Sequence, residues 1–403
     1  MRAPNYMKYF KCIGGACEDN CCIGWDVDID KATFIKYQKV THPLMQKALK
    51  RYVKVNPDAY SDSINYAFAV LTKEKHCSFL NADHLCMIHK HLGEDYLSNV
   101  CDSFPKITNK IDGRIERSAT PSCPEVMRLL AESPEAMVLE NLKDPTSTPI
   151  VSFDILQQDK RFKGTLISNL LKIRNTCLDY FESDALPLEA QLLNLSDFIV
   201  EIVAIEAIYN QSSIDAALKN AGKRIHDARD RYDFKGESLL LSKDYLRFSE
   251  MLINHLGKVG ADDSKRYLEL SKHAMQGDTV LGNERFNAFN QLHPHILRNL
   301  IKNHIFKNLF PFSEGENAEE ALWLLLSRYA MIKRQLIGLA GYDEPLTTER
   351  VVTYLQVFSK VIEHHKHFET RTIETLKAQK IDSKKLIKIL FIEGSIQGGK
   401  QHA

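Results

Sequence analysis

Apolar positions follow a helical period through most of the later part of the chain. In the stretch TTERVVTYLQVFSKVIEHH, residues 347–365, Val351, Leu355 and Phe358 share one face of a helix with their apolar neighbours. The same kind of pattern predicts helices at 164–182, 187–209, 237–256, 285–309 and 319–341, the last one ending at Gly341. We therefore expect residues 153–403 to form an all-helical domain that binds a substrate or a partner.

The first part of the chain has shorter patterns. Val27 and Ile29 alternate with aspartates, which indicates a short half-buried strand, and Asp30 is placed to cap a helix through KATFIKYQKV. The pair Asp112-Gly113 supplies the tight turn of a hairpin in ITNKIDGRIERSAT. These elements predict a small α+β domain.

A polar segment with two prolines, KDPTSTPIVS at 143–152, predicts a linker between the two parts. We expect a fold that is mainly α, with a cysteine-rich, metal-binding α+β domain at residues 1–143 followed by the helical domain. Cutting the chain near residue 145 should separate them, with the metal in the N-terminal fragment.

Composition and charge exclude some classes of protein. With 53 basic and 52 acidic residues among 403, the formal net charge is +1, which predicts no nucleic-acid partner. No apolar run approaches the roughly 20 residues of a membrane span, and no apolar signal segment follows the N-terminus. We expect a cytoplasmic protein in which cysteines stay reduced.

The cysteines are unevenly distributed. Eight of the nine precede residue 124, and the ninth, Cys177, reads as a core residue of its helix. In a reducing compartment, clustered thiols are more often metal ligands than disulfides. The candidate metal ligands are therefore Cys12, Cys17, Cys21, Cys22, Cys77, Cys86, Cys101 and Cys123.

Spacing favours an iron–sulfur cluster over zinc, which stays the alternative. The series Cys12-x4-Cys17-x3-Cys21-Cys22 lacks the paired C-x2-C knuckles of a zinc ribbon. Adjacent cysteines point apart in most backbones, so Cys21 and Cys22 are not expected to serve one small ion together. Iron–sulfur clusters accept irregular spacings. At the predicted start of a helix, Cys123 is also favoured as a thiolate.

Two histidine motifs are candidates for additional metal ligands. His89 follows Cys86 by three positions and could be a ligand, but it is better interpreted as a polar residue flanking the site. His364, His365 and His367 do not share one face of a helix, so they are interpreted as solvated. Asp26, Asp28 and Asp30 could receive a substrate amine, although the wet face of a strand explains them better.

Several motifs in order resemble one known family. FKCIGGACEDNCCIGWD, then CSFLNADHLCMIHKHLGEDYLSNVCDSFPK, then SATPSCPE are similar to the bacterial flagellin lysine-N-methylases. The likeness covers roughly residues 8–130. The cysteine-rich core is also similar to small proteins described as zinc- or iron-chelating domains, which share a C-x-x-F-P ending like Cys101 to Pro105.

The resemblance implies methyl transfer from S-adenosylmethionine to surface lysines of flagellin, with an iron–sulfur cluster, most simply 4Fe-4S, on the family's cysteines. Eight cysteines exceed one cluster, so a second metal is bound or some cysteines are structural. No strand precedes a G-x-G loop, so a Rossmann-like pocket for the methyl donor is unsupported, and the C-x3-C-x2-C radical signature is absent. Catalytic and donor-binding residues are not identified. The competing hypothesis is a non-catalytic zinc- or iron-binding interaction module.

Overall fold

The computed structural model describes residues 1–23, 26–143, 150–182, 186–231, 242–256, 262–365 and 367–392. Most of the predicted linker, 144–149, lies outside them, as does the end of the chain from residue 393. Two compact units are present. Unit 1 comprises Met1–Ile155, Val259–Tyr267 and Gln356–His364, and unit 2 comprises Leu156–Lys258, Leu268–Leu355 and His365–Ala403.

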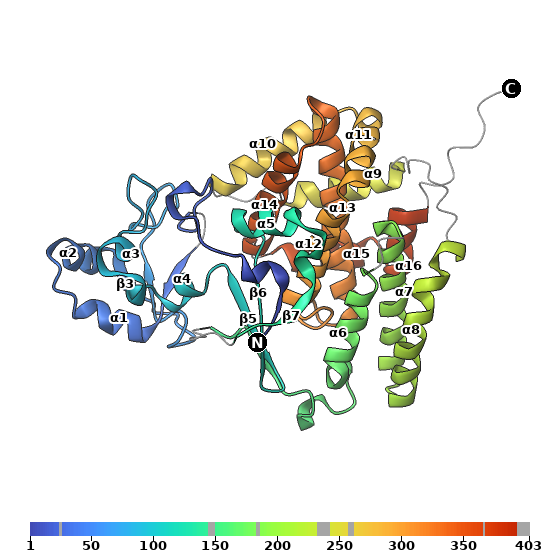
Figure 1. Cartoon of the computed structure of the whole chain (residues 1–403), viewed down its shortest axis with the longest axis horizontal. Helices are drawn as coiled ribbons and strands as arrows, with labels where there is room; N and C mark the ends of the chain where they lie inside the picture. Colours follow the sequence, from blue (N-terminus) through green and yellow to red (C-terminus); the bar gives the residue numbers. More distant parts are fainter. Residues whose placement is uncertain are drawn as a thin grey trace. The chain divides into compact units, whose positions relative to one another are not determined.

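Unit 1 contains a small three-stranded sheet with helices packed on it (Figure 1). Its strands run antiparallel in the order β2 (Val27–Ile29), β4 (Ala67–Ala69) and β3 (Val53–Val55). The alternation seen in the sequence buries Val27 and Ile29 against α1 (Lys31–Gln38), α2 (Pro43–Tyr52) and α3 (Met87–Leu92). Asp30 caps α1, as predicted, by accepting a hydrogen bond from the backbone N of Thr33.

A second sheet in unit 1 contains five strands in the order β7 (Leu139–Asn141), β1 (Arg2–Pro4), β6 (Arg114–Ala119), β5 (Lys106–Ile111) and β8 (Phe153–Ile155). The predicted β5–β6 hairpin is confirmed, and Asp112 and Gly113 take the positive φ angles, 48° and 78°, that its turn requires. Two short helices complete the described elements used below: α4 (Asn99–Ser103) and α5 (Pro124–Glu132).

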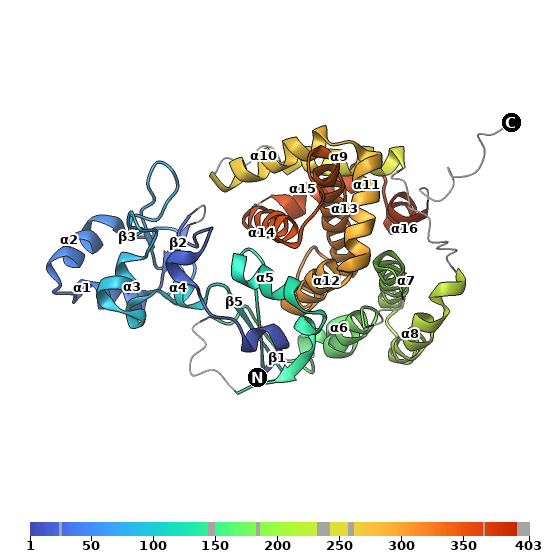
Figure 2. The same cartoon turned by 45° about the horizontal axis from the view of Figure 1, so that its top comes forward.

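All regular elements among the described residues of unit 2 are helices. Its elements are α6 (Leu170–Asp179), α7 (Leu188–Glu206), α8 (Gln211–Arg231), α9 (Lys243–Leu256), most of α10 (Asp262–Gln276), α11 (Thr279–Leu292), α12 (His295–Lys307), α13 (Ala318–Tyr342), α15 (Phe368–Ala378) and α16 (Ser383–Ile387). The long helix α13 is buried on nearly every side and lies among α9, α11, α12 and α15 (Figure 2). Helix α14 (Thr348–His364) belongs to unit 2 up to Leu355 and to unit 1 from Gln356 onward.

The mainly helical fold with a small strand-containing N-terminal part is as expected from the sequence. Three details differ. The predicted helix at 285–309 is two helices, because Pro294 interrupts the pattern after His293. Helix α13 continues past Gly341 to Tyr342. Strands β1, β3, β4, β7 and β8 were not predicted. Among the described residues, no helix combines the length and the apolar character that crossing a membrane needs.

Candidate functional site

Five of the predicted ligands come together beside the small sheet of unit 1. The loop after Cys17 turns back so that the Cys22 carbonyl accepts the backbone N–H of Cys77 at 2.8 Å. Residues Leu80 and Cys86 pair as a bridge, which brings Cys86 to the start of α3, and Cys101 lies on α4. All four segments pack against one apolar core. We name this set, Cys21, Cys22, Cys77, Cys86 and Cys101, the cysteine group.

The thiol of Cys22 is at the centre of this group. It contacts the thiols of Cys21, Cys77 and Cys86. The expectation that Cys21 and Cys22 point apart is therefore wrong. The turn at 21–22 and the pairing with Cys77 direct both sulfurs to the same place, a tertiary constraint that two letters of sequence do not contain.

The thiols share their protons unevenly. Contacts with Cys21, Cys77 and Cys86 raise the pKa of Cys22, while contact with Cys22 lowers the pKa of each neighbour, that of Cys86 to about 6. Like charges this close disfavour one another, so the group cannot become fully ionised without a cation in its midst. Such a set of soft donors is chemically suited to a metal centre.

Cys101, the fifth member of the group, and His89, which flanks Cys86, have different environments. Burial raises the pKa of Cys101 to about 12, with the neighbouring thiols contributing. The exposed His89 lowers the pKa of Cys86 through its charge and its backbone N–H, the latter at the start of α3. This agrees with a flanking residue.

The other three predicted ligands form a second set. Cys12 is exposed, Cys17 is half-buried, and both act electrostatically on Cys123 at the N-terminus of α5. Burial raises the pKa of Cys123 to about 12, against the opposing effect of the amides of Glu125 and Val126. The prediction that its helix N-terminus favours thiolate is therefore outweighed by burial. The eight cysteines divide into a group of five and a group of three.

Among the described residues, no set of three or more His, Cys, Asp or Glu side chains is arranged as a ready site for a metal ion. The thiol of Cys22 contacts those of Cys21, Cys77 and Cys86, whereas Cys101 interacts with the group electrostatically. The donor set nevertheless fits an iron–sulfur cluster, or zinc, by its chemistry, since four thiols in contact are present and thiolates are the ligands both prefer. Which cysteines bind which metal stays a prediction.

An ion pair that the sequence did not predict holds the loop between Cys17 and Cys21. The Nζ of Lys360, on α14, donates to Asp19 Oδ1 at 2.8 Å, and the Nε2 of Gln356 donates to Asp19 Oδ2 at 2.7 Å. Lys360 is buried and Asp19 is half-buried, with side-chain exposures of 7% and 14%. The charge of Lys360 also helps to lower the pKa of Cys21, after its contact with Cys22. The only sequence feature that could have pointed to Asp19 is its position between Cys17 and Cys21.

The aspartates of the β2 region have separate roles. Asp26 is exposed, but Asp30 is buried and its two oxygens accept the backbone N–H groups of Thr33 and Asn99. The interpretation of Asp30 as part of a wet strand face is therefore wrong. Its carboxylate caps α1 and anchors α4.

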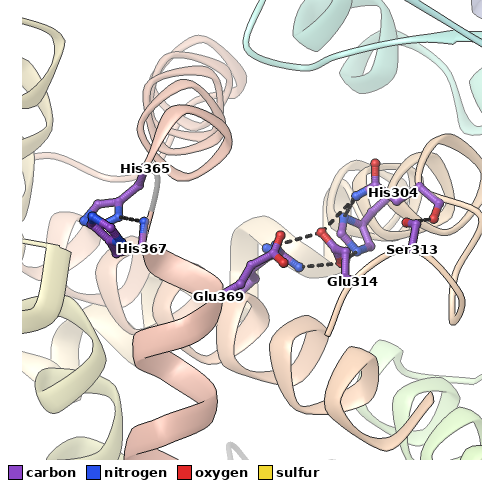
Figure 3. A network of polar contacts seen from close by, with 8 residues as sticks. His304, Ser313, Glu314, His365, His367 and Glu369 are labelled. Atoms are coloured by element: carbon purple, nitrogen blue, oxygen red, sulfur yellow. Dashed lines mark hydrogen bonds and ion pairs between the residues drawn. The ribbon is translucent and has the colours of Figure 1, made fainter. Parts of the chain in front are cut away.

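Unit 2 has a half-buried polar network of its own. Glu314 lies 2.9 Å from His304 Nε2 and accepts two hydrogen bonds from Arg328, and Figure 3 shows His304 and Glu314 pointing toward each other. Burial would raise the pKa of Glu314, but Arg328 and His304 outweigh it and lower that pKa strongly. The network joins α12, α13 and the loop between them, a structural role.

The histidines of the EHHKHF motif lie at a helix junction. His364 ends α14, and the backbone N–H of His367, next to α15, donates to His365 Nδ1 at 3.2 Å (Figure 3). The sequence interpretation placed them on one solvated helix, and this is wrong because α14 ends at His364.

Comparison with known proteins gives a consistent family. The profile described as "FliB lysine N-methylase C-terminal domain" matches residues 174–390, more than half of the chain. Two proteins named lysine-N-methylase, from Salmonella choleraesuis (strain SC-B67) and Salmonella typhimurium (strain LT2), are each 24% identical over 404 residues, covering 91% of this chain and 94% of their own. The "flagellar biosynthetic protein FliU" of Salmonella muenchen is 31% identical over 144 residues, which is 35% of this chain and 82% of that protein. No solved structure matches.

The chain belongs to the FliB lysine N-methylase family. The profile covers the helical part, whereas the motifs that carried the resemblance lie before residue 130, so the two lines of evidence come from different segments. Lysine methyl transfer is the activity that this membership supports.

Proposed function

We propose that this protein is an S-adenosylmethionine-dependent protein-lysine N-methyltransferase that acts on flagellin and carries an iron–sulfur cluster on its cysteine group. The observation that carries the proposal is the family match over residues 174–390, together with lysine-N-methylases that align along 91% of the chain. The flagellar name of a third relative supports flagellin as the substrate. We expect the reaction to take place in the cytoplasm.

The reaction sets a requirement on the substrate lysine. Its neutral amine attacks the methyl carbon of the sulfonium donor, a new N–C bond forms, and the C–S bond breaks with its electron pair passing to sulfur. The amine must first lose a proton, since the reference pKa of lysine is about 10.4. A site that desolvates the ammonium lowers this pKa and promotes the step.

The cysteine group would hold the cluster through Cys21, Cys22, Cys77 and Cys86, whose thiols are in contact. Cys101 is a fifth candidate in the same group, and Cys12, Cys17 and Cys123 stay candidates for a second site or for structural roles. When bound, the cluster supplies redox-active iron and a cationic centre that stabilises thiolates. The protein's own contribution is a dry, apolar base beneath the thiols.

The competing function is a non-catalytic zinc- or iron-binding interaction module. Metal content and transfer together separate the two. Protein prepared and reconstituted without oxygen is analysed for iron, sulfide and zinc, and then incubated with flagellin and methyl-labelled S-adenosylmethionine. We expect a brown protein with iron and sulfide, and label on flagellin lysines. A colourless protein with stoichiometric zinc would exclude the iron–sulfur cluster, and unlabelled flagellin would exclude the methyltransferase activity.

A further inference from the structure

The end of α14 reaches both sets of cysteines within unit 1. Gln356, Lys360 and Glu363 are spaced by four and three residues, so they lie on one face of the helix. Gln356 and Lys360 bind the two carboxylate oxygens of Asp19, at 2.7 Å and 2.8 Å, in the loop that connects Cys17 to Cys21. The sequence separation of 341 residues between Asp19 and Lys360 makes this contact a feature of the tertiary fold.

The same helix face also holds the segment before Cys123. Gln356 Nε2 donates to the carbonyl of Ser122 at 2.9 Å, and Glu363 contacts the hydroxyl of Thr120. Gln356 is 1% exposed and Ser122 is 3% exposed, so water does not compete for the hydrogen bond between these two residues. One amide group therefore ties the loop of the cysteine group to the approach to Cys123.

The local structure shows why this loop depends on such a partner. Residues 17–22 contain no regular element, and within them Asp19 Oδ1 and Asn20 Oδ1 accept the backbone N–H groups of Asn20 and Cys22. Cys22 is fixed to Cys77 by one backbone hydrogen bond. Without the cation and amide of α14, the half-buried Asp19 carboxylate would lose its charged partner, and a charge that is largely removed from water is unfavourable when it is unpaired.

We propose that Lys360 and Gln356 are positioning residues of the cysteine group: by holding Asp19, the end of α14 fixes the loop 17–22 so that Cys21 and Cys22 can bind metal. Lys360 adds a fixed positive charge beside a set of thiols that accumulate negative charge on ionisation. The inference rests on the proposed function only for the identity of the metal, because the ordering of the loop concerns the protein alone.

The test uses the full chain and four variants. Lys360→Met removes the charge, Lys360→Arg keeps it, and the double variant D19N/K360M removes both charges so that no carboxylate is left unpaired. The matched control is E189Q/K333M, which removes an ion pair of 2.7 Å from unit 2 in which the lysine is 6% exposed, compared with 2.8 Å and 7% for the Asp19–Lys360 pair. Hydrogen exchange of peptides covering residues 12–23 is measured in metal-free protein, and iron and sulfide are measured after anaerobic reconstitution.

We expect exchange in residues 12–23 to rise about tenfold or more in Lys360→Met and in D19N/K360M, and bound iron to fall to about half or less. Lys360→Arg should restore both, and its visible spectrum should match the wild type. The control should lower the unfolding temperature but leave exchange in 12–23 and iron content unchanged. Wild-type exchange in D19N/K360M, or equal loss in the control, would overturn the inference. If the reconstituted wild type binds no iron but exchange in residues 12–23 still rises in Lys360→Met, the iron–sulfur cluster is refuted and the positioning role stands.

Discussion

At the scale of single residues, one carboxylate of unit 2 has a pKa that structural pairing lowers well below its ordinary value. Glu189, in the first turn of α7, accepts hydrogen bonds from Lys333 Nζ at 2.7 Å and from the Tyr329 hydroxyl at 2.6 Å. Burial would raise the pKa of Glu189, but these two partners outweigh it and lower the pKa to about 2. The carboxylate is therefore ionised at every physiological pH and stabilises the fold by its pairing.

This pair predicts a pH-dependent stability. Because the folded pKa of Glu189 lies below its ordinary value of 4.5, its stabilisation is complete above that value and is lost as the pH falls toward about 2. Glu189→Gln should lower the free energy of unfolding by about 3 kcal/mol at pH 7, and the difference should shrink below about pH 4. Thermal unfolding across pH tests this, with the exposed Glu284→Gln as control. A difference that does not change with pH would contradict the assignment.

Sequence reasoning at this scale found residue types better than partners. The concentration of cysteines before residue 124, the cap at Asp30 and the core position of Cys177 are visible in the sequence, and the structure buries Cys177 completely. The pairing of Asp19 with Lys360 is not visible, because a contact between distant segments depends on the tertiary fold. The same reason explains why the thiols of Cys21 and Cys22 were expected to point apart, whereas in the structure they are in contact.

At the scale of elements, glycine permits the closest helix contacts of unit 2. A Cβ added at Gly282 on α11 would lie 2.1 Å from the carbonyl oxygen of Ile337 on α13, and one at Gly338 would lie 2.0 Å from that of Ala274 on α10. Real Cβ atoms do not approach backbone this closely. The absence of a side chain at these positions therefore lets the helix backbones touch.

Gly282→Ala should reverse the usual sign of such a substitution. In an exposed helix, replacing glycine by alanine stabilises by about 1 kcal/mol. Here the added methyl group forces α11 away from α13, and overpacking of this kind costs about 3 kcal/mol. Chemical denaturation measures the net loss, and Glu284→Ala, an exposed position on the same helix, should change stability by less than about 0.5 kcal/mol. A stabilised Gly282→Ala protein would show that the two helices are not in contact.

The sequence pattern predicted the long helices well and the short strands poorly. The helices at 187–209 and 347–365 correspond to α7 and α14 within a few residues, because a long apolar stripe has one favourable arrangement. Pro294 could have divided the pattern at 285–309, since proline disfavours a helix at the residue before it. Strands β1 and β7 have three residues each and pair only with each other and with β6. Nothing local identifies them.

At the scale of the whole molecule, the two units are interleaved along the sequence. Unit 1 includes Gln356–His364, more than 200 residues beyond its main segment Met1–Ile155. The sequence placed a boundary between 143 and 153, and whether the parts on either side fold independently stays a prediction. The interleaving alters what we expect of a cut there.

A protease site inserted within residues 144–149 tests this organisation. Because Gln356, Lys360 and Glu363 contact Asp19, Ser122 and Thr120 within unit 1, the two pieces of the cut chain should elute together and keep their metal. Size-exclusion chromatography with iron analysis before and after cutting gives the answer. An N-terminal piece that elutes alone and retains its iron would show that α14 is dispensable to it.

The most direct measurement of the central claim is methyl transfer in single cysteine variants. Cys22→Ala removes the thiol that contacts three others, and Cys177→Ala removes one that is buried in α6 and belongs to unit 2, whereas the predicted ligands belong to unit 1. Both are prepared anaerobically, analysed for iron and sulfide, and assayed with flagellin and methyl-labelled S-adenosylmethionine. The account predicts that Cys22→Ala loses cluster and label transfer together, while Cys177→Ala keeps both. Full transfer by Cys22→Ala would contradict it and show that the reaction does not depend on the cysteine group.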